Sequence, residues 1–149
     1  MRITELVTGG QTGVESAVFD FARDHGIPCS GFYSDLAILD NEPSDPIRLN
    51  ELDGPTEDFS WRNVRRSDAV LIIQSSLGYS PTALAARENA MILNKPRLVT
   101  SALASKTVFE WLNNFDEIKL HITGAKDIEW PRAYERTYTL LEKILTSEA

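Results

Sequence analysis

The run "AVLII", Ala69–Ile73, constrains the fold more than any other segment because it contains no polar residue. A half-exposed strand would alternate apolar and polar side chains, whereas a strand covered on both faces needs none. This run therefore predicts a central strand of a parallel sheet with helices on both sides.

Apolar strand-like runs and amphipathic helix-like runs alternate along the rest of the chain. The expected strands are 2–8, 28–33, 69–73, 97–100 and 118–123, and the expected helices are 12–25, 56–66, 81–93, 105–114 and 131–145. Residues 34–55 have no clear periodicity and are expected to form a long loop. Repeated strand–helix units imply right-handed crossovers. We therefore expect residues 1–149 to form one three-layer, doubly wound α/β domain with a mainly parallel sheet.

Composition excludes several classes of function. The net charge of −7 has the wrong sign for a protein that neutralises nucleic-acid phosphates. No apolar stretch approaches the roughly 18 residues that a membrane span needs. The N-terminus lacks a signal-peptide pattern and the chain has a single cysteine, Cys29, so we expect a cytoplasmic protein. The two histidines are far apart in the sequence and have no cysteine cluster near them, which argues against a metal site built by the protein.

The segment "GGQTG", Gly9–Gly13, holds three of the eight glycines and joins the first strand to the first helix. Glycine permits sharp turns and close approach of a ligand to the backbone. The unpaired N–H groups and positive dipole end of the following helix suit a phosphate. The segment matches neither the dinucleotide fingerprint nor a P-loop. We expect an anion site formed by Gly9, Gly10, Gln11, Thr12 and Gly13, the alternative being a tight turn that binds nothing.

Other segments that follow strands could contribute to the same site, because ligands of such folds collect beyond the carboxyl ends of the strands. We expect contributions from Gly78, Ser80 and Thr82 after the third strand and from Gly124 after the last; an ordinary helix cap is the alternative for Ser80. Arg62, in "WRNVRRSD", is the arginine we expect to reach an anion. No nucleophile elbow or paired carboxylates indicate catalysis.

These motifs resemble the molybdenum-cofactor carrier proteins, which have a Rossmann-like fold. The resemblance covers most of the chain, and the segments that carry it are "GGQTGVESAVFDFARDHGIP", "WRNVRRSDAVLII", "SPTALAARENAMILNKP" and "ITGAKDIEWPRAYE". Glu15 replaces the aspartate common in the family. The family's basic stretch after the second strand is replaced by "YSDLAILD", residues 33–40.

The resemblance implies a carrier that binds the molybdenum cofactor (molybdopterin), a pterin with a terminal phosphate, then protects it or delivers it to apo-molybdoenzymes. The metal would arrive with the cofactor. The resemblance also implies a homo-oligomer.

Two alternatives remain open. The wider superfamily includes lysine-decarboxylase-like phosphoribohydrolases that cleave nucleoside monophosphates, and their PGGxGTxxE pattern is imitated loosely by Gly78, Thr82 and Glu88. The chain could instead be a nucleotide-binding protein without chemistry. We expect a binding or carrier protein rather than an enzyme.

Overall fold

The computed structural model describes residues 1–33, 50–51, 59–75 and 78–145. It contains, in chain order, β1 (Arg2–Val7), α1 (Val14–His25), β2 (Cys29–Ser30), β3 (Phe32–Tyr33), β4 (Asn50–Glu51), α2 (Phe59–Arg66), β5 (Ala69–Ile73), α3 (Pro81–Ile92), β6 (Arg97–Thr100), α4 (Ser105–Leu112), β7 (Glu117–Gly124) and α5 (Ala133–Leu145). No helix among the described residues is long and apolar enough to cross a membrane.

The main sheet has five strands in the order β2-β1-β7-β5-β6, and every pairing is parallel. The last strand, β7, is inserted between β1 and β5, so the three strands lie side by side although they are far apart in sequence. The carboxyl ends of all three consequently meet at one edge of the sheet.

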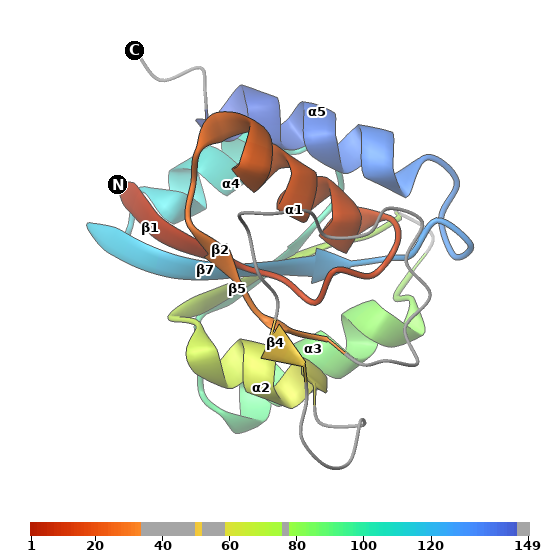
Figure 1. The fold of residues 1–149 in the computed structure, drawn as a ribbon, viewed down its shortest axis with the longest axis horizontal. Coiled ribbons are helices and arrows are strands. Elements are labelled where there is room, and N and C mark those ends of the chain that lie inside the picture. Colours follow the sequence, from red (N-terminus) through yellow and green to blue (C-terminus); the bar gives the residue numbers. More distant parts are fainter. Residues whose placement is uncertain (34–49, 52–58, 76–77, 146–149) are drawn as a thin grey trace.

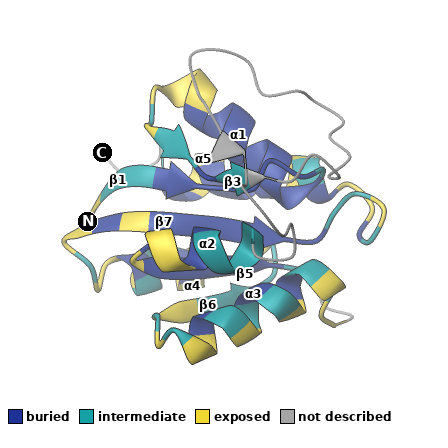
Figure 2. Ribbon diagram, turned by 60° about the horizontal axis from the view of Figure 1, so that its bottom comes forward, coloured by how far each residue is buried: buried dark blue, intermediate teal, exposed yellow. Residues whose placement is uncertain are grey.

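Helices cover both faces of this sheet and give three layers. In Figure 1, α1, α4 and α5 lie on one side of the strands, and α2 and α3 lie on the other. Figure 2 shows that β5 and most of β7 are buried between these layers. The expected doubly wound α/β fold is confirmed, and all five residues of Ala69–Ile73 are fully buried as their composition predicts.

Local signals explain where the helices begin and end. Helix α1 ends at Gly26, which adopts a left-handed conformation (φ 66°) and donates its N–H to the Ala22 carbonyl. Helix α3 begins after Ser80, whose hydroxyl accepts the Ala83 N–H at 3.1 Å, with Pro81 in the first turn. The expected bounds of both helices hold to within two residues.

The second strand departs from expectation. The sequence predicts one strand over 28–33, but Gly31 interrupts it: β2 pairs with β1, whereas β3 leaves the main sheet and pairs with β4 in a separate two-stranded sheet. Gly31 passes so close to the backbone that a Cβ there would lie 1.8 Å from the Thr8 carbonyl oxygen. The expectation of an unstructured loop over 34–55 is wrong at β4; residues 34–49 and 52–55 lie outside the described part of the chain.

Candidate functional site

The glycine-rich turn between β1 and α1 is folded around a carboxylate of its own helix. Glu15 is 3% exposed, and its Oε1 accepts the Gln11 N–H at 3.1 Å while the Gly9 N–H donates to the same carboxylate. The Thr123 hydroxyl of β7 donates to Glu15 Oε2 at 2.8 Å. Two of the amides expected to meet an anion are therefore already bonded to an internal one.

The environment of Glu15 shifts its titration. Burial raises the pKa of Glu15 above its ordinary value, and the hydrogen bonds from Thr123, Gln11 and Gly9 offset part of that rise. The neutral form of this side chain is therefore more accessible than that of an exposed glutamate.

The glycines are required by close packing as well as by backbone conformation. A Cβ at Gly9 would lie 2.7 Å from Glu15 Oε1. Gly10 and Gly13 have φ angles of 75° and 80°, and a Cβ at Gly13 would lie 2.4 Å from the Ala125 carbonyl oxygen. Glycine alone tolerates both conditions at little cost.

The end of β7 and the loop that follows it pack on this turn. The Ala125 carbonyl accepts the Val14 N–H at 3.1 Å, and a Cβ at Gly124 would lie 1.8 Å from the Ile73 carbonyl oxygen at the end of β5. The structure thus brings Gly9–Gly13 and Gly124 together at the carboxyl edge of β1, β7 and β5.

Several polar groups at this edge have no hydrogen-bond partner in the described part of the chain. The Gln11 side chain is 6% exposed, yet its Oε1 accepts no hydrogen bond from the described residues. The N–H groups of Thr12 and Gly13 donate to none of the described residues, and the N-cap of α1 has no side-chain hydrogen bond. Buried polar side chains are usually hydrogen-bonded, so the unpartnered Gln11 oxygen at a helix N-terminus favours a ligand there.

Gln74, the first residue after β5, was not among the site residues expected from the sequence. It is half-buried, and its Oε1 also has no hydrogen-bond partner within the described ranges. Its position directly after a buried strand was the available signal, since such positions face the carboxyl edge.

Gly78, Ser80 and Thr82 belong to the same β5–α3 connection, of which residues 76–77 are outside the described part. Ser80 serves as the N-cap of α3, the ordinary role that the sequence left open. Gly78 is exposed with a φ of 132°, and a Cβ at this position would meet nothing within 4 Å, so no packing requirement explains the glycine.

Arg62 belongs to a basic pocket beside α2. It lines a pocket of 510 Å³ together with Phe32, Arg65, Arg66 and Lys119, and no residue of Gly9–Gly13 belongs to that lining. Its guanidinium carbon lies 6.0 Å from the centroid of the Phe32 ring.

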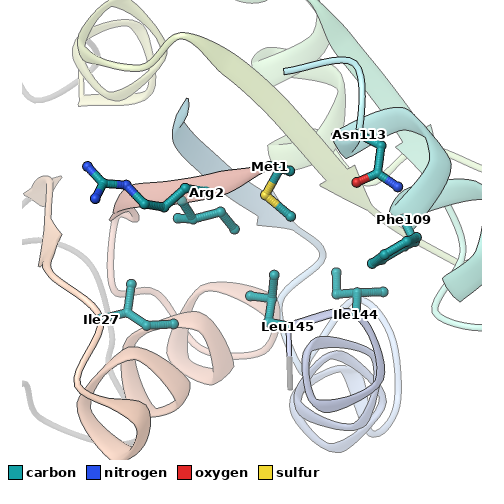
Figure 3. Close-up of a pocket in the computed structure, with 8 residues that line it drawn as sticks. Met1, Arg2, Ile27, Phe109, Asn113, Ile144 and Leu145 are labelled. Carbon is teal, nitrogen blue, oxygen red and sulfur yellow. The ribbon is translucent and has the colours of Figure 1, made fainter. Parts of the chain in front are cut away.

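A further cavity of 330 Å³ lies at the opposite, amino end of the strands (Figure 3). Most of its lining side chains are apolar, and the full set is Met1, Arg2, Ile3, Ile27, Phe109, Asn113, Ile144 and Leu145.

Metal-binding clusters and activated thiols are not found in the described part of the chain. No group of three or more His, Cys, Asp or Glu side chains that could hold a metal occurs among the described residues. His121 is buried, its Nδ1 is 2.8 Å from the Val7 carbonyl oxygen, and burial lowers its pKa to about 4. Burial raises the pKa of the Cys29 thiol to about 12, which disfavours a nucleophilic thiolate.

Comparison with known proteins agrees with this architecture. The fold is similar to the crystal structure of the putative molybdenum carrier protein from Syntrophus aciditrophicus SB, with a TM-score of 0.81, 25% sequence identity, and coverage of 96% of this chain and 95% of that one. This match supports the family resemblance drawn from the sequence. No curated protein matches the chain. A family model, that of the circularly permutated YpsA SLOG family, matches residues 6–145. Because that match spans nearly the whole domain, the chain belongs to the circularly permutated YpsA SLOG family.

Proposed function

We propose that this protein binds the molybdenum cofactor through its terminal phosphate at the β1–α1 turn and protects it or delivers it to apo-molybdoenzymes. The observation that carries the proposal is the buried Gln11 Oε1 without a partner among the described residues, beside the N–H groups of Thr12 and Gly13. The similarity to a protein named as a molybdenum carrier supports the choice of ligand.

The residues fit a phosphate-bearing pterin in three respects. The Thr12 and Gly13 amides at the N-terminus of α1 would donate to the phosphate, and the helix dipole would favour its charge. Gln11 Oε1 offers an acceptor for an N–H donor of a pterin ring. Gly78, Ser80, Thr82 and Gly124 would form the neighbouring walls of the site, because their connections follow the adjacent strands.

Glu15 changes how the turn would work. Its carboxylate occupies the Gly9 and Gln11 amides, so these support the turn rather than contact the phosphate. When bound, the cofactor would supply the metal and its dithiolene ligands, while the residues of this chain would bind, orient and shield it.

The test is the cofactor content of protein purified, without dialysis, from a host that makes molybdopterin. We expect molybdenum by elemental analysis and a pterin by mass spectrometry. Thr12→Asp places a fixed carboxylate in front of the helix amides and should lower the load at least tenfold. Thr139→Asp, an exposed position on α5, is the matched control and should load like the wild type.

Two outcomes would contradict the proposal: wild-type protein that carries neither molybdenum nor pterin, or a Thr12→Asp variant that loads normally. Release of free base from nucleoside monophosphates would instead support the phosphoribohydrolase alternative, for which Glu88 lies exposed on α3. The expected homo-oligomer and the cytoplasmic location remain predictions, and light scattering of the purified protein tests the former.

A further inference from the structure

Four basic side chains gather around one pocket of this acidic protein. Arg62, Arg65 and Arg66 come from α2, and Lys119 comes from β7; with Phe32 they line a space of 510 Å³. The spacing of the arginines, i, i+3 and i+4, brings them to one face of the helix. Because the chain carries a net charge of −7, this concentration of cations is not a property of the surface in general.

Part of this charge is neutralised internally. Arg66 Nε lies 3.0 Å from Glu5 Oε2 and 2.8 Å from Ser30 Oγ, and Ser30 is itself hydrogen-bonded to Glu5. This pairing holds the Arg66 guanidinium in place. Arg65 and Lys119, which also line the pocket, are not part of this ion pair.

Arg65 and Lys119 provide the remaining charge. Both are exposed, and neither side chain has an ion-pair partner within the described ranges. The Asp68 carboxylate accepts the backbone N–H of Lys119 at 2.9 Å, and Glu5 is the register partner of Lys119 on β1, so two acidic residues lie beside this lysine. The negative end of the α2 dipole explains why Arg65 and Arg66 occur in the last turn of that helix. It does not explain why Lys119 of β7 lies at the same pocket.

We propose that this pocket binds the phosphate groups of an organic phosphate the size of a nucleotide. Guanidinium groups bind phosphate oxygens in a bidentate manner, and an ammonium group adds a compact charge. The volume lies within the range of small-molecule sites and exceeds what a single phosphate would fill. Phe32, half-buried at the wall and in contact with Arg62, offers an apolar surface for the remainder of the ligand.

This site is separate from the one proposed for the cofactor. None of the described lining residues belongs to the glycine turn, so either site could exist without the other. The inference does not rest on the proposed carrier function.

The experiment measures binding of ADP, pyrophosphate and adenosine by calorimetry at about 20 mM and about 200 mM salt. We expect ADP and pyrophosphate to bind the wild type more weakly at the higher salt, and adenosine alone to bind at least tenfold more weakly than ADP. Arg65→Ala combined with Lys119→Ala should weaken ADP binding at least tenfold. Arg97→Ala combined with Lys106→Ala removes the same charge from exposed positions outside the pocket and should change binding less than twofold.

Arg65→Gln alone keeps a good helix former at an exposed position and serves if the double variant does not fold; it should weaken ADP binding at least threefold. Absence of ADP and pyrophosphate binding to the wild type would overturn the proposal. An equal loss in the control variant would also overturn it. Loss of pyrophosphate binding in Thr12→Asp, with retention in the pocket variants, would assign the anion to the glycine turn instead.

Discussion

The Glu15 side chain determines which N–H groups of the glycine turn remain available to a ligand. Its carboxylate accepts hydrogen bonds from two amides of the turn and from Thr123 on β7, so it joins the turn and the start of α1 to a strand that is distant in sequence. We expect Glu15→Ala to lower the free energy of unfolding by about 2–4 kcal/mol, because it leaves buried donors without an acceptor. Chemical denaturation of the variant measures this loss.

The control is Glu88→Ala, which removes the same side chain from an exposed position of α3. It should change stability by less than about 0.5 kcal/mol. Equal effects of the two substitutions would mean that the hydrogen bonds to Glu15 do not stabilise the turn.

His121 predicts a dependence of stability on pH. Burial lowers its pKa in the folded protein to about 4, whereas the unfolded chain has the ordinary value of about 6.5. As pH falls below 6.5, the unfolded state takes up a proton that the folded state does not, so the fold loses stability. Between pH 7 and pH 5 this contribution should be a loss of about 2 kcal/mol.

His121→Asn retains a donor for the Val7 carbonyl and does not titrate, so the difference between wild type and variant isolates this contribution. Glu15 acts in the opposite direction: its raised pKa makes the fold lose stability as pH rises above the ordinary value of 4.5. The free energy of unfolding of wild type and of His121→Asn is measured by urea denaturation at each pH. The same pH dependence in both proteins would disprove the role of His121.

At the scale of elements, the contact between the β1–α1 turn and the β7–α5 loop should tolerate no added atom. Gly13→Ala combines a φ of 80° with a clash against the Ala125 carbonyl and should cost more than about 3 kcal/mol of stability. Gly26→Ala is the matched control, since Gly26 has a similar φ of 66° but open space around it, and it should cost about 1–2 kcal/mol. Comparable thermal shifts for both variants would show that the two loops can separate.

Elements that bury a periodic face could be predicted from the sequence, and those formed by tertiary contact could not. The strand expected over 69–73 has the observed bounds. Its apolar run begins and ends where the strand enters and leaves the buried sheet. Strand β4 has two residues, too few for any period to appear, and β3 depends on its close approach to Thr8 at Gly31.

Only part of the candidate site could be predicted from the sequence. The three clustered glycines predicted the position of the turn. Because Gly124 ends the last strand of a parallel sheet, it was expected at the same edge. The hydrogen bond from Thr123 to Glu15 joins residues that are 108 positions apart, so no local pattern reveals it. The sequence analysis groups Arg62 with the glycine turn, whereas the structure places it in the lining of the basic pocket. The pattern of polar residues along a helix does not show which neighbouring strand an arginine on that helix will face.

At the scale of the whole molecule, the two helical layers are unequal. The layer of α1, α4 and α5 packs large side chains on the sheet, including Phe21, Leu112, Leu140 and Leu141. The layer of α2 and α3 contributes one valine, Val64, and three alanines, at positions 83, 86 and 90, to its core cluster. Because stabilisation scales with buried apolar area, the second layer should be the less stable one.

Native-state hydrogen exchange tests this difference on two helices of equal length, α1 and α3, each of twelve residues. Amides of α3 should exchange through openings that require at least about 2 kcal/mol less free energy than those of α1. The layers also carry different proposed sites: the glycine turn leads into α1, whereas the basic pocket lies against α2. A cofactor at the turn should therefore slow exchange in α1, and ADP in the basic pocket should slow exchange in α2. Uniform slowing by both ligands would mean that the layers open as one unit, and that binding at either site stabilises the whole domain.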